Sequence, residues 1–154
     1  MVQEKDDPKD DPMAAAFAAA RAAAAAGETP VGAALAREGK VIAAAGNRVV
    51  LDRDPTAHAE ILAIRRAAAE IGSERLVGCD LYVTLEPCAM CAGAISFARI
   101  RRLYWAANDP KGGAVEHGPR FFSQPTCHHA PELYGGIRES EAAEMLREFF
   151  KARR

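Results

Sequence analysis

The chain has 154 residues, of which 20 are Lys or Arg and 21 are Asp or Glu, so its formal net charge is −1. This length fits one domain with a core of its own and is short for two. The charge balance excludes a uniformly basic nucleic-acid binder and an acidic disordered chain. A run of 18 apolar residues does not occur, so the sequence predicts no membrane-spanning helix.

The N-terminal part divides into a charged tail and a helix. Residues 1–10 carry many charges and few apolar groups, and we expect them to be a disordered acidic tail. Asp11 followed by Pro12 is typical of a helix N-terminus, because an acid caps free backbone N–H groups and proline fits the first turn. The alanine-rich stretch then predicts a helix over 12–26 that ends at Gly27.

Strands and helices alternate through the rest of the chain. Short apolar runs around a glycine turn predict a hairpin, and apolar side chains at helical spacing predict amphipathic helices. In chain order we expect a hairpin over 32–37 and 41–47, a helix over 57–71, a strand over 81–85, a helix over 87–98, a strand over 102–106, a short strand over 133–134 and a last helix capped by Ser140.

The order of these elements predicts the fold class. A strand, a helix and a strand over 81–106 have the length of a parallel crossover unit. We therefore expect a three-layer α/β/α domain, with a mixed sheet of about five strands covered by helices on both faces. The segment 107–131 has no period, and a loop of that length is usually functional or contains short helical turns.

The four cysteines indicate a compartment and a chemistry. The alanine-rich stretch is preceded by acidic residues and interrupted by Arg21, whereas a secretion signal begins with positive charge. We therefore expect a cytoplasmic protein, in which paired cysteines more often hold a metal than form a disulfide. The cysteines are Cys79, Cys88, Cys91 and Cys127.

Two short motifs point to a metal site. His58-Ala59-Glu60 and Pro87-Cys88-Ala89-Met90-Cys91 each lie at the start of a predicted helix. Cys88 and Cys91 are three residues apart in a first turn, so both sulfurs can face one ion, and His58 supplies a third donor. Three protein donors and a water form a catalytic zinc site, whereas four protein donors form a structural one.

Glu60 gives this site a possible reaction. Helix starts carry partial positive charge, which favours thiolates, and zinc lowers the pKa of a bound water to about 7. A carboxylate beside that water can accept and return its proton. Residues two apart lie on nearly opposite sides of a helix, so His58 and Glu60 share a site only if His58 lies in an irregular first turn. Pro55-Thr56 places the helix start there.

Each motif alone is weak, because buried cysteines are ordinary core residues. Together they are specific, since each follows a proline at a predicted helix start and a strand separates them. We therefore expect one Zn²⁺ per chain. The arrangement His-x-Glu followed by Pro-Cys-x-x-Cys is also the established pattern of zinc deaminases.

The chain resembles the zinc-dependent cytidine and adenosine deaminase superfamily, and within it the bacterial tRNA-specific adenosine deaminases. The resemblance runs from about Ala14 to Arg154. It implies a cytidine-deaminase-like fold in which 11–154 form a single deaminase domain. The segments that carry it are 30–33, 46–48, 54–61, 81–88, 90–95, 109–113 and 149–151 with Arg153 and Arg154.

The resemblance also implies roles for individual residues. It assigns zinc binding to His58, Cys88 and Cys91, and proton transfer to Glu60. It assigns purine binding to the Asn47 side chain, and a pocket lining to the backbone of Ala59 and Glu86. Further expected RNA contacts are Asp109, Lys111, Phe149, Phe150 and Arg153, with one of the two phenylalanines packing its helix onto the sheet.

The implied substrate is adenosine at the wobble position of a tRNA anticodon stem-loop, converted to inosine by a homodimer in which a neighbour's loop completes the RNA surface. One alternative is a small-molecule deaminase of the same fold, acting on guanine, cytosine or cytidine. A second is a structural zinc module that only binds RNA. Cys127, His128 and His129 are poorly spaced for a second ion, and we expect them to pack their loop or face the anticodon.

Overall fold

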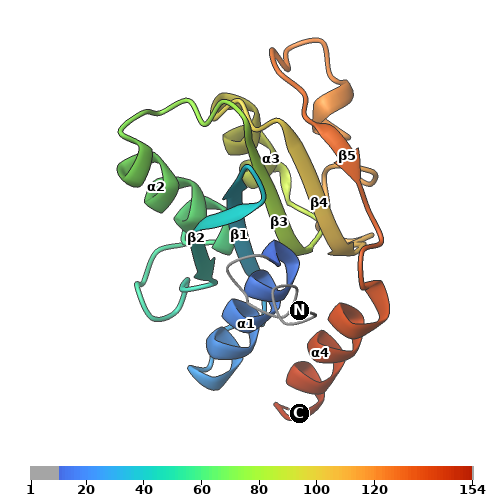
Figure 1. Ribbon diagram of the computed structural model, residues 1–154. Helices are drawn as coiled ribbons and strands as arrows, with labels where there is room; N and C mark the ends of the chain where they lie inside the picture. The colour runs from blue at the N-terminus through green and yellow to red at the C-terminus, as the bar shows by residue number, and fades with distance from the viewer. Residues whose placement is uncertain (1–10, 154) are drawn as a thin grey trace, which may run out of the picture.

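The computed structural model describes residues 11–153, in which four α-helices surround one five-stranded sheet (Figure 1). The predicted disordered tail over 1–10 lies outside the described residues. In chain order the elements are α1 (Pro12–Ala25), β1 (Gly32–Arg37), β2 (Lys40–Gly46), α2 (Ala59–Ile71), β3 (Cys79–Leu85), α3 (Ala89–Phe97), β4 (Arg102–Ala107), the 3₁₀ helix η2 (Phe121–Ser123), β5 (Glu132–Tyr134) and α4 (Glu139–Lys151).

The first helix begins and ends as the sequence predicts. Asp11 is extended, and its carboxylate accepts a hydrogen bond from the Ala14 backbone N–H at 3.0 Å. Pro12 occupies the first turn, where no backbone donor is needed. Gly27 follows the helix with a φ of +87°, a conformation that glycine adopts without a Cβ penalty.

The sheet is mixed, with strand order β2-β1-β3-β4-β5. The hairpin of β1 and β2 turns at Glu38 and Gly39, which have φ values of +54° and +79°. Positive φ at both central positions matches the twist of a two-residue hairpin. β1 also pairs antiparallel with β3, whereas β3, β4 and β5 run parallel. The parallel pairing of β3 and β4 across α3 confirms the predicted crossover.

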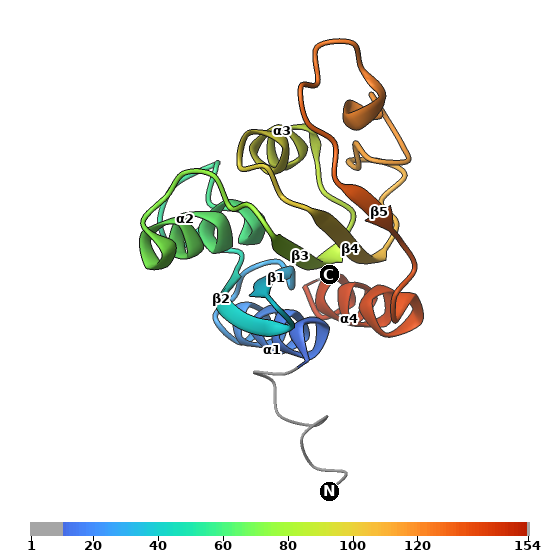
Figure 2. The ribbon, with the colours of Figure 1, turned by 45° about the horizontal axis from the view of Figure 1, so that its top comes forward.

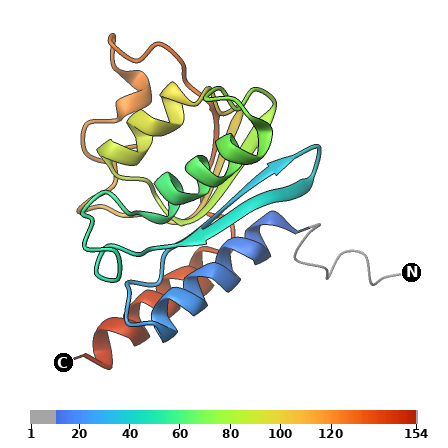
Figure 3. The same ribbon diagram turned by 90° about the vertical axis from the view of Figure 1, so that its left-hand side faces the viewer.

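Helices cover both faces of the sheet, so the predicted three-layer architecture is confirmed. α2 and α3 lie side by side on one face, and α1 and α4 lie on the other (Figures 2 and 3). The apolar core is divided accordingly into a cluster under α2 and α3 that includes Trp105, and a cluster under α1 and α4 that includes Phe17. The Trp105 indole N–H donates to the Asn108 side-chain oxygen at 2.9 Å, just beyond the end of β4.

The last third of the chain confirms one prediction and contradicts another. The long segment after β4 contains the 3₁₀ helix η2, which packs against α3, so the expectation of a short helical turn there is confirmed. Ser140 does not cap α4, because the helix begins earlier. Arg138 is the N-cap in a left-handed conformation, with φ +60°, and its guanidinium pairs with Glu141 at 2.7 Å. None of the helices within 11–153 combines the length and apolar character that a membrane crossing needs.

Candidate active site

The two ligand motifs meet where α2 and α3 begin. His58 and Cys88 are the N-cap residues of these helices, both with extended backbone, and neither side chain makes a capping hydrogen bond. The helices therefore start two residues later than predicted. This explains how His58 and Glu60 share one site, because His58 lies before the helix and Glu60 in its first turn. Both cap side chains are free to face the site.

The donor atoms have the spacing of a tetrahedral metal site. The His58 Nδ1 lies 3.6 Å from the Cys88 Sγ and 3.5 Å from the Cys91 Sγ. Zinc bonds of about 2.3 Å to sulfur and 2.0–2.1 Å to nitrogen, at tetrahedral angles, separate S and N by about 3.6 Å. These three residues are the one group of this kind within 11–153. The residues fit a zinc ion with three protein donors, the number typical of a catalytic site.

The cysteines are polarised before any metal binds. The hydrogen bond from the Cys91 thiol is the largest cause that lowers the pKa of Cys88 to about 4, and His58 lowers it further against the opposing effect of burial. The same hydrogen bond and burial raise the pKa of Cys91. Cys88 is therefore a thiolate at neutral pH, the form in which cysteine binds a metal.

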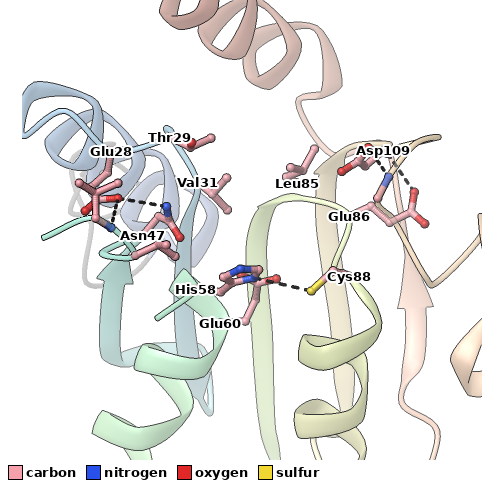
Figure 4. A pocket seen from close by; sticks show the side chains of 13 residues that line it. Glu28, Thr29, Val31, Asn47, His58, Glu60, Leu85, Glu86, Cys88 and Asp109 are labelled. Atoms are coloured by element: carbon pink, nitrogen blue, oxygen red, sulfur yellow. Dashed lines mark hydrogen bonds between the residues drawn. The ribbon is translucent and has the colours of Figure 1, made fainter. Parts of the chain in front are cut away.

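Glu60 lies beside the three donors and is 4% exposed. Burial raises the pKa of its carboxyl, and the backbone N–H of Glu60 itself opposes that rise. A carboxyl with a raised pKa can hold a proton at a pH where an exposed one is ionised, which suits it to general acid–base chemistry. Figure 4 shows His58, Glu60 and Cys88 together at the base of one pocket.

The pocket has a volume of about 420 Å³ and extends from this base between two loops. One side is formed by residues after α1 and β2, and the other by the end of β3 and the segment after β4 (Figure 4). The lining residues are Glu28, Thr29, Val31, Asn47, Val49, Val50, His58, Glu60, Leu85, Glu86, Cys88, Asp109 and Gly112. Such a cavity, partly apolar with a few convergent polar groups, is typical of a small-ligand site.

Glu28 is a pocket residue that the sequence analysis did not single out. The residue is 1% exposed, and its carboxylate accepts hydrogen bonds from the backbone N–H groups of Val50 at 3.2 Å and Leu51 at 2.7 Å. It also accepts one from the Asn47 side-chain amide at 3.4 Å. Glu28 thus joins Asn47 to the neighbouring loop. The sequence gives only a weak signal for this role, namely an acidic residue between Gly27, which ends α1, and the start of β1.

Only the backbone of Glu86 was predicted to line the pocket, but its side chain also has a structural role. Its carboxylate turns away from His58 and accepts hydrogen bonds from the segment after β4. Burial acts to raise the pKa of this carboxyl, but hydrogen bonds from Asp109, His117, Val115 and Glu116 outweigh it, and the pKa lies below its ordinary value. Glu86 is therefore a buried carboxylate that stays ionised.

Of the remaining predicted site residues, some line the pocket and others lie outside it. Asn47, Glu86 and Asp109 line the pocket, and Ala59 is buried between two residues that do. Lys111 is exposed beside the lining residue Gly112 and does not line the pocket itself. Phe149 and Phe150 lie in the last turn of α4 and Arg153 lies just after the helix; none of them lines the pocket, so their RNA contacts stay predictions.

Cys127 and His129, near the end of the long segment, pack it onto α3 and onto the residues between α3 and β4, whereas His128 is exposed. The Cys127 thiol donates to the His129 backbone carbonyl at 3.1 Å and lies 3.6 Å from the Ser96 hydroxyl. The His129 ring bonds to the Ile100 carbonyl at 2.7 Å. These contacts agree with a packing role.

Comparisons with known proteins place this geometry in a family. The cytidine and deoxycytidylate deaminase zinc-binding region matches residues 7–107. A tRNA-specific adenosine deaminase of Agrobacterium fabrum is 66% identical over 127 residues, which are 82% of this chain and 84% of that protein.

Two solved structures resemble the fold. One, from a study of A-to-I editing by tRNA:A34 deaminases at the wobble position, has a TM-score of 0.87 and 62% identity, covering 88% of this chain and 99% of that one. The guanine deaminase of Nitrosomonas europaea has a TM-score of 0.79 and 28% identity, covering 96% and 90%. From the matched zinc-binding region and these identities, the chain belongs to the cytidine and deoxycytidylate deaminase family.

Proposed function

We propose that the chain is a zinc-dependent hydrolase that deaminates adenosine to inosine at the wobble position of a tRNA anticodon. The observation that carries the reaction type is the set of three donors, His58, Cys88 and Cys91, beside the buried Glu60 at the base of a pocket. A structural zinc module would need a fourth protein donor and would leave Glu60 without a role. The substrate is inferred from the tRNA-specific adenosine deaminases to which the chain is similar.

His58, Cys88 and Cys91 would hold the zinc ion, which when bound lowers the pKa of a water to about 7 and so provides a nucleophile. Glu60 takes one proton from the water and delivers it to N1 of adenine as the C6–O bond forms. Glu60 then moves a second proton from the new hydroxyl to the C6 amine. The C6–N bond breaks, ammonia leaves, and C6 keeps the oxygen as a carbonyl.

The pocket residues would orient the base for this transfer. The Asn47 side chain would hydrogen-bond the purine, and the backbone at Ala59 and Glu86 would border it. Adenine must be unstacked to reach Glu60, and a single-stranded anticodon loop exposes it at low energetic cost. Asp109, Lys111, Phe149, Phe150 and Arg153 are proposed to contact the surrounding stem-loop.

The proposal extends to the assembly and the setting of the enzyme. Residues 11–154 would form a single deaminase domain, and two copies would form a homodimer in which a loop of each completes the RNA surface of the other. With a tRNA as its substrate, the enzyme would act in the cytoplasm.

One assay tests the substrate. The zinc-loaded protein is incubated with an anticodon stem-loop and, separately, with free adenosine, guanine and cytidine, while ammonia is measured and the product is analysed by mass spectrometry. The proposal expects inosine at the wobble position, with activity that falls steeply as salt increases, because RNA is a polyanion. Turnover of guanine without turnover of the stem-loop would instead assign the activity of the Nitrosomonas europaea relative.

A further inference from the structure

We infer that the Glu86 carboxylate positions the substrate-binding wall of the active site. In this role it holds the segment over 109–117 in the conformation that closes one side of the pocket. The inference rests on the proposed function, since it concerns how the pocket that accepts the base is kept in shape. Glu86 touches no reacting atom in this role, so it is a positioning residue.

The first observation is the number of hydrogen bonds on one buried side chain. The Glu86 side chain is 0% exposed. Its Oε1 accepts from the Asp109 N–H at 3.0 Å and lies 2.7 Å from the His117 Nδ1. Its Oε2 accepts from three consecutive backbone N–H groups, those of Val115 at 3.1 Å, Glu116 at 3.1 Å and His117 at 3.2 Å. Consecutive N–H groups facing one anion form a concave nest, here occupied by a carboxylate of the chain itself.

The second observation is what these bonds hold in place. Asp109 and Gly112 line the pocket, and Glu86 binds the Asp109 backbone directly. The Asp109 carboxylate in turn accepts from the N–H groups of Lys111 at 3.2 Å and Gly112 at 3.0 Å. The position of the Asp109 backbone therefore sets the position of the whole turn that borders the pocket.

The third observation is the close packing at Gly113. A Cβ at this position would lie 2.5 Å from the Glu86 Oε2 and 2.5 Å from the Asp109 carbonyl oxygen. Cβ atoms in proteins essentially never lie within 3.0 Å of such neighbouring atoms. The segment can thus approach the Glu86 carboxylate only because residue 113 has no side chain. A disturbance introduced at either residue should have the same effect on the wall.

Backbone bonds that do not involve the carboxylate keep the neighbouring chain folded. The Glu86 N–H donates to the Ala107 carbonyl at 2.8 Å, and the Ala114 N–H donates to the Pro87 carbonyl at 2.9 Å. Loss of the carboxylate should therefore loosen 109–117 locally and leave the start of α3, with Cys88, in place.

The test is a Glu86→Gln variant of the zinc-loaded full chain. Glutamine has the same shape, but its NH₂ group cannot accept a hydrogen bond, so at least one of the N–H donors loses its partner. We expect KM for the anticodon stem-loop to rise roughly tenfold, in line with the loss of one hydrogen bond to a charged group. The value of kcat should stay within about twofold of wild type, because Glu60 still transfers the protons. Zinc content should not change, and hydrogen exchange should accelerate in 109–117 alone.

Glu116→Gln is the matched control. It removes the same charge within the segment that Glu86 binds, but the Glu116 side chain is exposed and only its backbone N–H binds Glu86. This variant should keep the wild-type KM and exchange pattern. If Glu86→Gln does not fold, Gly113→Ala replaces it, and the same rise in KM with the same local exchange is expected.

The outcomes separate this inference from the proposed function. An unchanged KM with fast exchange in 109–117, or faster exchange throughout the chain with an unchanged KM, overturns the positioning role. Wild-type exchange in 109–117 of Glu86→Gln, or of Gly113→Ala where that variant replaces it, also overturns it. If the wild-type protein fails to deaminate every RNA, the proposed function fails, while exchange in 109–117 still decides whether Glu86 holds the segment.

Discussion

The Glu28 carboxylate accepts a hydrogen bond from the Asn47 side-chain amide across 3.4 Å and fixes the orientation of that amide in the pocket. The two residues are 19 positions apart, one after α1 and the other after β2. Because Glu28 can only accept, the Asn47 nitrogen must face it, and the Asn47 oxygen must face elsewhere.

Glu28→Gln is expected to lower kcat/KM for the stem-loop by roughly tenfold, as expected for the loss of about one hydrogen bond to a charged group. A glutamine can donate as well as accept, so the Asn47 amide can then flip. Zinc content should be unchanged, which a metal assay on the purified variant would show. Glu38→Gln, in the exposed hairpin turn, is the control and should behave as wild type. Wild-type kinetics in Glu28→Gln would contradict this role.

Glu60→Gln should keep about one zinc per chain and lose activity by a factor of roughly 10² to 10⁴, the usual contribution of a general acid–base group. The amide cannot carry the proton from water to N1, but it does not disturb the three metal donors. Ammonia release and metal analysis on the same sample check both parts. Glu70→Gln, on the exposed side of the same helix, should leave turnover unchanged. Normal turnover by Glu60→Gln would refute the assignment.

Removal of zinc with a chelator should abolish deamination, and added zinc should restore it, because the nucleophile depends on the ion. Cys91→Ser should bind zinc much more weakly, since a hydroxyl is a poor replacement for a thiolate donor. Cys127→Ser should still bind one zinc, as Cys127 lies outside the donor group. Equal zinc content in the two variants, measured after dialysis, would argue against the site described here.

The raised pKa of Tyr82 predicts that the folded protein loses stability at alkaline pH. Burial, followed by the neighbouring Tyr104, raises its pKa from 10.0 to about 12. Because the folded-state pKa is raised, the neutral phenol stabilises the fold fully below pH 10, and this stabilisation is lost as the pH rises through 12. Denaturant unfolding of wild type and Tyr82→Phe should therefore show a free-energy difference that is constant up to about pH 9 and shifts in favour of the phenylalanine variant above pH 10. A difference that stays constant to pH 12 would show that Tyr82 ionises as easily in the folded protein.

Arg153 at the end of α4 is expected to bind a phosphate. Its guanidinium lies 3.5 Å from the centre of the Phe149 ring, so its side chain is already oriented before RNA binds. Arg153→Gln should weaken stem-loop binding and reduce the slope of log K against log salt by about one. Arg75→Gln, an exposed arginine just before β3, serves as the comparison. An unchanged slope in Arg153→Gln would place the RNA elsewhere.

Local signals in the sequence account for most of the fold and for the metal donors. Asp11, Pro12 and Gly27 mark a helix by their own chemistry, and two motifs at helix starts identify His58, Cys88 and Cys91. These helix ends and ligand motifs are made by residues close together in the sequence, so the spacing of residue types along the chain is enough to identify them. The cap of α4 was assigned wrongly to Ser140 because the left-handed turn at Arg138 has no such local signature.

The side-chain roles of Glu28 and Glu86 could not be predicted, because they depend on contacts between distant segments. Glu86 binds N–H groups 23 to 31 positions further along the chain. The resemblance to the deaminase superfamily implied only a backbone role for Glu86. A buried acid bound by several backbone N–H groups becomes recognisable only when the sheet order brings the segment after β4 against the end of β3.

The sequence contains a single tryptophan, Trp105, and its buried indole donates to Asn108, the residue before Asp109 in the pocket wall. Its tryptophan fluorescence therefore comes from one known place, and the hydrogen bond to Asn108 links that place to the wall. Loosening of the wall should therefore change the intrinsic emission, which can be recorded in real time with no dye attached to the protein or to the RNA.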